Sequence, residues 1–143
     1  LLVGETAGWL GQSMYLREIC AREEGAPPPV DLIEERENGD FVRGLILDGT
    51  ATAVHDLSDG GLLIALAEMA MASGIGAKVD AAPDDIPAHA YWFGEDQARY
   101  VVTVPSAKAQ TVLGRARALA RTGLACNVRG GGRRDALAPR QRR

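Results

Sequence analysis

The stretch Thr50-Ala51-Thr52-Ala53-Val54-His55-Asp56-Leu57-Ser58-Asp59-Gly60-Gly61-Leu62 decides the fold. Its first five residues are uncharged and partly β-branched, which predicts a buried strand. The apolar run from Leu62 to Ala72 carries a single charge and has high helix propensity, which predicts a buried helix. The two elements are joined by an acidic, glycine-containing turn. A strand, such a turn and a helix in this order form the place where α/β-type domains bind ligands.

The turn offers the groups that a magnesium–nucleotide complex needs. Gly60 and Gly61 let the backbone approach a ligand without a Cβ clash, and the following helix N-terminus favours a phosphate. Asp56 and Asp59 supply oxygen ligands of the kind that hold Mg²⁺ together with substrate phosphates. In the alternative, purely structural interpretation, Ser58 or Asp59 caps the helix and the glycines only form the turn. Spacing alone favours neither interpretation.

Length and composition are those of one globular domain. The chain has 143 residues, of which 46% are hydrophobic and 24% charged, so it can bury a sizeable core. A formal net charge of −3 gives no electrostatic case for nucleic-acid binding, and no apolar run is long enough for a membrane span. The chain opens at Leu1-Leu2-Val3, as if within a strand, and we therefore expect it to be a piece of a longer protein.

The cysteines and histidines predict neither a disulfide nor a zinc site. Cys20 and Cys126 are far apart and lack the paired spacing of redox or metal motifs, so we expect reduced thiols in a cytosolic protein. His55 and His89 are likewise not spaced as a pair of metal ligands.

The remaining segments predict an α+β domain. Apolar periodicity and turn residues predict further helices over 14–22, 31–47 and 107–121, and further strands over 1–3, 75–80, 100–104 and 124–128. From the central strand onward the order is β-α-β-β-α-β, the ferredoxin-like arrangement. We predict a mixed β-sheet packed with helices over residues 1–129. Residues 130–143 are basic and poor in apolar side chains, which predicts a disordered or aberrant tail.

Several blocks, in one order along the chain, carry a specific resemblance. They are Gly4-Glu5-Thr6, Leu10-Gly11-Gln12-Ser13, Pro27-Pro28-Pro29-Val30-Asp31, Asn38-Gly39-Asp40-Phe41-Val42-Arg43, His55 to Leu62, and Phe93-Gly94-Glu95-Asp96-Gln97-Ala98-Arg99. With these blocks, the chain up to about Arg121 resembles the C-terminal domain of phosphoribosylformylglycinamidine synthase, the synthetase subunit of purine biosynthesis. The end departs from the family pattern, because Arg133-Arg134-Asp135-Ala136-Leu137 stands where the family carries a Gly-Gly-Asp-Ala-Leu-like segment.

The resemblance implies an ATP-dependent carbon–nitrogen ligase of the cytoplasm. Such enzymes convert formylglycinamide ribonucleotide and glutamine-derived ammonia to formylglycinamidine ribonucleotide, with Mg²⁺ and ATP or ADP as cofactors. The implied partners are the upstream domains of the same chain, a glutaminase subunit and a small accessory subunit, with no nucleic acid and no membrane. The catalytic residues of the family lie in upstream domains. The resemblance therefore implies that the present domain contains no catalytic residues and is inactive alone. It also implies that the domain contributes an auxiliary, structural nucleotide site.

The resemblance also implies functions for the turn. Asp56 is expected to ligate Mg²⁺ and Ser58 to contact the nucleotide, and related kinases also use the aspartate that corresponds to Asp59. Together with the chemistry of the turn, this predicts Ser58, Gly60 and Gly61 as nucleotide-binding residues and Asp56 and Asp59 as metal ligands.

Three further site candidates lie outside the turn. Glu5 belongs to the N-terminal turn, and Glu95 and Gln97 correspond by pseudo-symmetry to an acid-x-Gln run that binds substrate in the catalytic half of the family.

Two alternatives remain for the whole domain. One is a domain of a sister enzyme, of the aminoimidazole ribonucleotide synthase or thiamine-monophosphate kinase type, although the blocks at 27–29 and 94–99 argue against it. The other is a non-catalytic module that holds a nucleotide to stabilise its neighbours.

Overall fold

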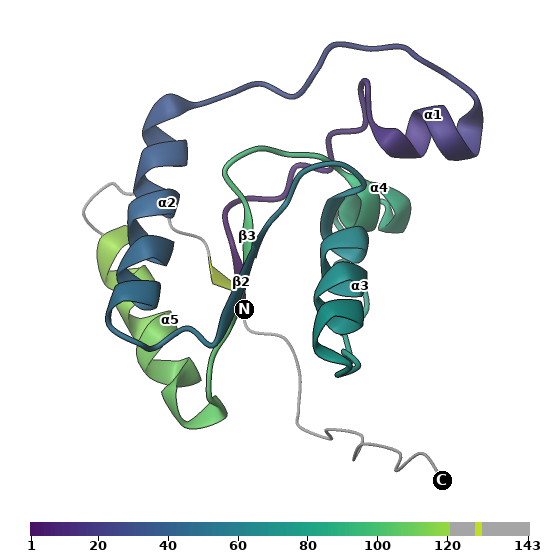
Figure 1. The fold of residues 1–143 in the computed structure, drawn as a ribbon. Coiled ribbons are helices and arrows are strands. Elements are labelled where there is room, and N and C mark those ends of the chain that lie inside the picture. The colour runs from purple at the N-terminus through teal and green to yellow at the C-terminus, as the bar shows by residue number, and fades with distance from the viewer. Residues whose placement is uncertain (121–127, 130–143) are drawn as a thin grey trace, which may run out of the picture.

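A small antiparallel sheet forms the centre of the molecule. The computed structural model describes residues 1–120 and 128–129. Its strands are β1 (Leu2–Val3), β2 (Ala53–Asp56), β3 (Tyr100–Thr103) and β4 (Val128–Arg129), in the spatial order β2-β3-β1-β4 (Figure 1). All pairings between these strands are antiparallel; Ala53 lies opposite Thr103, and Leu2 lies opposite Val101. Strand β2 therefore lies at one edge of the sheet, and the acidic turn follows it there.

Helices cover both faces of this sheet. In the described part of the chain they are α1 (Met14–Cys20), α2 (Leu32–Leu47), α3 (Gly61–Ser73), α4 (Ala88–Phe93) and α5 (Ser106–Ala120). Helices α2 and α5 lie on one face and α3 and α4 on the other (Figure 1). Helix α1 packs beside α4, where the rings of Tyr15 and Phe93 stack with 5.0 Å between their centroids. No helix within these residues combines the length and the apolar character that crossing a membrane requires.

The face under α2 and α5 holds the tighter core. Phe41, Val42 and Leu45 of α2 are buried against Val102 of β3 and Val112 of α5. The spacing of these α2 residues places them on one helical stripe, and each such buried side chain contributes about 1.5–3 kcal/mol. This face therefore anchors the sheet that carries the turn.

The stripe of α2 does not include its first apolar residues. The sequence also predicts that Leu32 and Ile33, apolar residues at the start of this helix, pack inward, but they are 77% and 70% exposed. The expectation was wrong because the stripe through Asn38 and Leu45 reaches the first turn at Glu34, and Leu32 and Ile33 lie off that stripe. These two side chains therefore do not contribute to the hydrophobic core.

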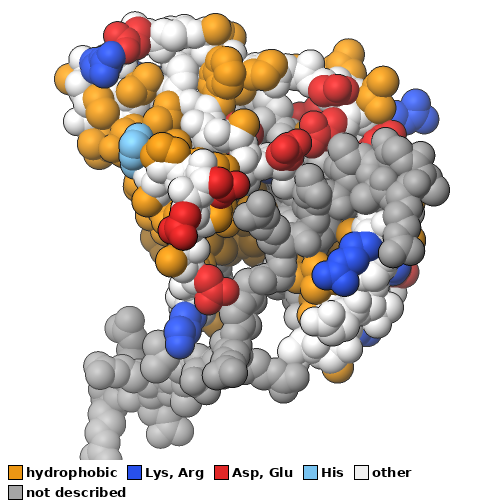
Figure 2. Space-filling model, turned by 180° about the vertical axis from the view of Figure 1, so that it is seen from behind, with side chains coloured by type: hydrophobic (Ala, Val, Ile, Leu, Met, Phe, Trp, Pro, Cys, Tyr) orange, Lys and Arg blue, Asp and Glu red, His pale blue; other side chains and the backbone are white. Residues whose placement is uncertain are grey.

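The face under α3 and α4 is covered less completely. Leu62 and Ala65 of α3 pack on Leu2 and Val101 of the sheet, whereas Met71 near the end of the helix is 76% exposed. The expected buried helix was therefore wrong, since Gly61, Leu62 and Ala65 are buried, whereas Leu66 and Met69 are covered only in part. Figure 2 shows hydrophobic side chains gathered at the surface of the part that carries α1, α3 and α4, at the left of that view.

The predicted α+β class is confirmed, with one missing strand. Residues 75–80 form no strand, so the β-α-β-β-α-β order lacks its second strand and the described sheet is antiparallel instead of mixed. The physical reason is that β3 already has β2 and β1 on its two sides, which leaves no free edge there for a further strand. Cys20 is exposed and free, as expected.

Some predictions lie outside the described residues. These are the thiol of Cys126, the strand from 124 to 127 and the basic tail over 130–143. The division into a domain of residues 1–129 and a tail therefore stays a prediction.

Candidate functional site

The turn between β2 and α3 exposes its polar side chains. Asp56, Ser58 and Asp59 are exposed, whereas Leu57 between them is buried. The N–H of Leu57 donates to the carbonyl oxygen of Arg99 at 2.8 Å, which attaches the turn to the start of β3. The oxygens of the three polar side chains are therefore presented to solvent, where a ligand can reach them.

The start of α3 is capped from elsewhere in the chain. Its N-cap is Gly60, with φ of 80°, and neither Ser58 nor Asp59 provides the side-chain cap in the described structure. The N–H of Gly60 donates to Oε1 of Glu95 at 2.8 Å, and the N–H of Gly61 donates to the carbonyl oxygen of Ser58 at 3.1 Å. The interpretation of Ser58 or Asp59 as the helix cap was therefore wrong, and both glycine amides are already engaged within the protein.

Glycines allow three backbone segments to come into contact beneath the turn. Gly61 has φ of 67°, and a Cβ there would lie 2.5 Å from the carbonyl oxygen of Gly94. A Cβ on Gly94 would in turn lie 2.8 Å from Cα of Gly8. No side chain fits between segments this close. The turn, the segment that begins at Gly94 and the N-terminal loop therefore have a fixed separation.

The segment Gly94–Arg99 holds the N-terminal loop through a buried carboxylate. Asp96 is 8% exposed and accepts the N–H groups of Gly8 at 2.9 Å and Trp9 at 3.0 Å. Arg99 is 1% exposed and donates from Nη1 to Oδ2 of Asp96 at 3.3 Å. Burial lowers the pKa of Arg99, and the charge of Asp96 opposes that effect. Asp96 thus compensates a buried cation and two backbone donors together.

Helix α2 is tied to the same segment. The N–H of Ala98 donates to Oε1 of Glu35 at 2.8 Å, and Nδ2 of the buried Asn38 donates to the carbonyl oxygen of Ala98 at 3.0 Å. Gly94–Arg99 is therefore a structural hub that connects the N-terminal loop, α2, β3 and the turn before α3.

The eight predicted site residues fall into three places. Five of them, Asp56, Ser58, Asp59, Gly60 and Gly61, share the turn. Glu95 lies beneath the turn, 9% exposed and bonded to Gly60. Glu5 and Gln97 line a separate groove of about 590 Å³ beside the first turn of α2. The structure thus joins Glu95 to the turn and separates Glu5 and Gln97 from it.

The two candidate metal ligands have different neighbours. Asp56 lies opposite Tyr100 in the sheet, and the pKa of Tyr100 is raised mainly by burial, with Glu35 and Asp56 adding to the effect. The pKa of Arg17 is raised mainly by its hydrogen bond to Glu18 and in smaller part by Asp59.

The turn by itself offers an incomplete metal site. No three His, Cys, Asp or Glu side chains in the described ranges are grouped so that they could hold a metal ion. One or two exposed carboxylates suit a Mg²⁺ ion that takes its other ligands from phosphates and water. The chemistry of Asp56 and Asp59 therefore fits Mg²⁺ bound together with a nucleotide, and not Mg²⁺ alone.

His55 faces α3 with one ring nitrogen and contacts Asp56, the first residue of the turn, with the other. Its Nε2 lies 3.1 Å from Oε2 of Glu68, and Nδ1 lies 2.5 Å from the carbonyl oxygen of Asp56. This pair joins the edge strand to α3 at the side of an apolar groove of about 1030 Å³. The position of His55 is that of a structural contact.

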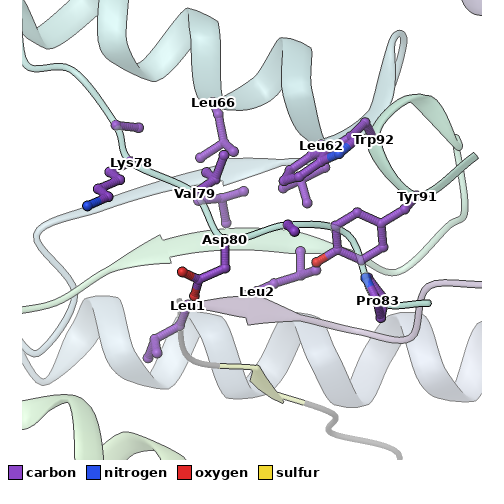
Figure 3. A pocket seen from close by; sticks show the side chains of 13 residues that line it. Leu1, Leu2, Leu62, Leu66, Lys78, Val79, Asp80, Pro83, Tyr91 and Trp92 are labelled. Carbon is purple, nitrogen blue, oxygen red and sulfur yellow. The ribbon is translucent and has the colours of Figure 1, made fainter. Parts of the chain in front are cut away.

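A further cavity lies on the α3–α4 side of the sheet. Its volume is about 310 Å³, and Figure 3 shows Leu62 and Leu66 of α3 and Tyr91 and Trp92 of α4 around it. None of the eight predicted site residues lines this cavity. Because its walls are largely apolar and carry few hydrogen-bonding groups for phosphates, we do not assign the nucleotide to it.

The family is decided by a match over most of the chain. Residues 1–128 match the sequence profile of the family described as AIR synthase related protein, C-terminal domain. The chain belongs to this family. The resemblance carried by the sequence blocks is thereby confirmed, and the fold above is that of an AIR synthase related C-terminal domain.

Curated relatives of this domain are much longer proteins. Phosphoribosylformylglycinamidine synthase subunit PurL of Bradyrhizobium diazoefficiens is 74% identical over 117 residues, which are 82% of this chain and 16% of that protein. The protein of the same name from Rhodopseudomonas palustris is 67% identical over 126 residues, which are 88% of this chain and 17% of that protein. The chain thus spans about a sixth of the length of these relatives.

Solved structures share the fold of the AIR synthase related C-terminal domain. Thermotoga maritima PurL complexed with FGAR matches with a TM-score of 0.66 and 22% identity, over 82% of this chain and 21% of that chain. The same protein complexed with ATP matches with a TM-score of 0.60 and 21% identity, over 82% of this chain and 19% of that chain. At this identity the likeness establishes the fold alone.

The sequence did not reveal the structural hub of this domain. Neither Asp96 nor Arg99 was a predicted site residue, although the two carry the buried ion pair. A signal was present, because Arg99 directly precedes a strand of apolar residues and a charge that enters a core needs a partner nearby in space.

Proposed function

We propose that this chain is the C-terminal domain of a phosphoribosylformylglycinamidine synthase. The observation that carries the proposal is the 74% identity over 117 residues with the Bradyrhizobium diazoefficiens protein of that name. Relatives from Rhodopseudomonas palustris bear the same name at 67% and 68% identity.

The whole enzyme would be an ATP-dependent carbon–nitrogen ligase. It would use ATP to activate the amide oxygen of formylglycinamide ribonucleotide, so that glutamine-derived ammonia displaces the phosphorylated oxygen and gives formylglycinamidine ribonucleotide. Catalysis of this kind depends on positioning and on neutralisation of phosphate charge. The Thermotoga maritima protein has been solved with ATP and with FGAR, which supports this assignment.

Within that enzyme, the turn after β2 would hold an auxiliary nucleotide with Mg²⁺. Asp56 and Asp59 would bind the metal ion, Ser58 would contact the nucleotide, and Gly60 and Gly61 would let the phosphates come close to the backbone. The exposure of all three polar side chains supports this assignment. When bound, Mg²⁺ would neutralise the phosphate charge, and the missing ligands would come from the phosphates, from water and from upstream domains.

Upstream domains would be the first partners of this domain. Leu32 and Ile33 on α2 and Leu63 on α3 are exposed apolar side chains that such domains would cover. A glutaminase subunit and a small accessory subunit complete the proposed cytoplasmic assembly. The existence of a structure described as PurLQS from Thermotoga maritima supports a multi-subunit assembly.

The proposed site is tested by calorimetric titration of ADP and Mg²⁺ into the complete polypeptide that carries this domain. The protein is first unfolded and refolded to remove bound nucleotide. Asp56→Asn should weaken binding at least about tenfold because a charged metal ligand is lost. Asp85→Asn, which removes a charge from an exposed loop, should leave the affinity unchanged.

Two outcomes would change the assignment. Equal affinity of the wild type and Asp56→Asn would move any nucleotide site away from the turn. Lost nucleotide binding with full turnover in Asp56→Asn would make the nucleotide a purely structural ligand.

A further inference from the structure

One buried carboxylate oxygen joins the turn before α3 to the start of α1. Oε1 of Glu95 accepts the N–H of Gly60 at 2.8 Å and the N–H of Met14 at 2.8 Å. Glu95 is only 9% exposed, so water competes little for this oxygen. The two donors belong to segments that are remote in sequence, and the carboxylate of Glu95 joins these segments by hydrogen bonds.

The link replaces a cap that the local sequence cannot provide. In a capping box, a Glu or Gln at the third helical position reaches back to the N–H of the N-cap residue. In α3 that third position is Leu63, and the N-cap Gly60 has no side chain. Glu95 supplies the missing acceptor from 35 residues further along the chain. Without it, the N–H of Gly60 would be a buried donor without a partner.

The position of Glu95 is itself fixed by its surroundings. The preceding residue, Gly94, is in backbone contact with Gly61, and the following residue, Asp96, holds Gly8 and Trp9. The carboxylate therefore approaches the turn from a rigid support and not from a mobile loop. A rigid support is what a residue needs if it is to hold a binding site in one geometry.

We infer that Glu95 is a positioning residue, which holds the turn 56–61 in its ligand-binding geometry without touching nucleotide or metal. The inference rests on the proposed nucleotide site and changes the expected function of Glu95 from substrate contact to support of the turn. The two functions differ in what they require. A positioning residue needs an acceptor oxygen at the right distance, whereas a metal or substrate carboxylate needs its charge.

Substitutions that separate acceptor from charge test the inference. Glu95→Gln keeps an acceptor oxygen on a side chain of the same length, Glu95→Asp keeps the charge on a side chain one methylene shorter, and Glu95→Ala removes both. Glu23→Gln is the control for loss of one exposed carboxylate. Each variant is made in the complete polypeptide, and two quantities are measured: hydrogen exchange of peptides that cover 13–18 and 57–63, and the affinity for ADP with Mg²⁺.

We expect Glu95→Gln and the control to resemble the wild type in both measurements. Glu95→Asp and Glu95→Ala should speed exchange in both peptides by about tenfold and weaken nucleotide affinity by about tenfold, since the N–H groups of Met14 and Gly60 lose their acceptor oxygen. Exchange in peptides from α5, which Glu95 does not contact, should not change. If Glu95→Ala does not fold, the pair Glu95→Gln and Glu95→Asp decides.

Other outcomes overturn the inference. Equal loss of affinity in Glu95→Gln and Glu95→Ala, with unchanged exchange, would make Glu95 a charged ligand of metal or substrate. Unchanged exchange in Glu95→Asp would show that the carboxylate does not hold the turn. Failure of the wild type to bind ADP with Mg²⁺ would refute the proposed nucleotide site instead, and the exchange rates would still decide whether Glu95 holds the turn.

Discussion

The two acidic segments of this domain use the same side chains for opposite purposes. In the turn 56–61, Asp56 and Asp59 are exposed, and the backbone is held by groups from other segments. In Gly94–Arg99, Glu95 and Asp96 are buried and accept backbone N–H groups from the N-terminal loop and the turn. Partners in space, and not composition, therefore distinguish a supporting acid from one that is free to bind a ligand.

The difference has an energetic consequence. A buried carboxylate is costly unless hydrogen bonds and opposite charge compensate it, so each partner of Glu95 or Asp96 is needed. An exposed carboxylate is solvated and contributes little to stability. We therefore expect stability to depend on Gly94–Arg99 and ligand affinity to depend on the turn.

The largest effect is expected for Asp96→Ala. The substitution leaves Arg99 as a buried cation without its partner and removes the acceptor of two N–H groups, which should destabilise the fold by about 3–5 kcal/mol. Urea unfolding followed by circular dichroism measures the change. The control is Asp40→Ala, which breaks an exposed pair with Arg36 at 3.8 Å and should cost less than about 0.5 kcal/mol. Equal effects of the two substitutions would contradict the contrast between buried and exposed acids.

Gly61→Ala comes next, because it acts where the two segments touch. The new Cβ would meet the carbonyl oxygen of Gly94 at 2.5 Å in a backbone with φ of 67°, so we expect a loss of about 2–4 kcal/mol. Gly76→Ala is the matched control, since nothing described lies within 4 Å of its Cβ position, and it should change stability by less than about 0.5 kcal/mol. Thermal unfolding of both variants measures the difference. A melting temperature of Gly61→Ala equal to that of the control would mean that the two segments are not in contact.

The smallest effect is expected for Glu34, an acid that is only partly buried. Burial, and then the charge of Glu5, raises the pKa of Glu34 in the folded state. The folded state therefore binds this proton more tightly than the unfolded state, and the stability it contributes at acid pH is lost as the pH rises through the raised pKa. Glu34→Gln does not titrate, so it should be more stable than the wild type at neutral pH by a few tenths of a kcal/mol, after allowance for solvent screening.

The pH dependence of the stability difference tests whether the raised pKa of Glu34 causes it. The stability difference between Glu34→Gln and the wild type should shrink as the pH falls from about 7 to about 3, because the wild-type carboxyl becomes protonated in both states. Chemical unfolding at several pH values measures it. A difference that is independent of pH would assign the effect to lost hydrogen bonds and not to the raised pKa.

Local patterns in the sequence were sufficient for most of the fold. The helices 14–20, 32–47, 61–73 and 106–120 follow from apolar periodicity, and the strand at 100–103 follows from its β-branched and aromatic residues. The predictions that were wrong concern segments whose secondary structure or burial depends on neighbouring segments of the fold. Residues 75–80 have the composition of a strand, yet β3, the strand beside which the ferredoxin-like order would place them, already pairs with β2 and β1. Leu32 has an apolar side chain, yet it lies off the stripe that meets the core.

The sequence by itself determined the family, the α+β class and the existence of an exposed acidic turn between a strand and a helix, because these depend on residues that are close together in the chain. Only the tertiary structure decided what each acid does. Glu95 and Asp59 both carry a carboxylate and each lies next to a glycine in the sequence, but Glu95 meets N–H groups of Met14 and Gly60 whereas Asp59 meets solvent. Those partners come from segments remote in sequence, and contacts of that kind form only when the chain has packed.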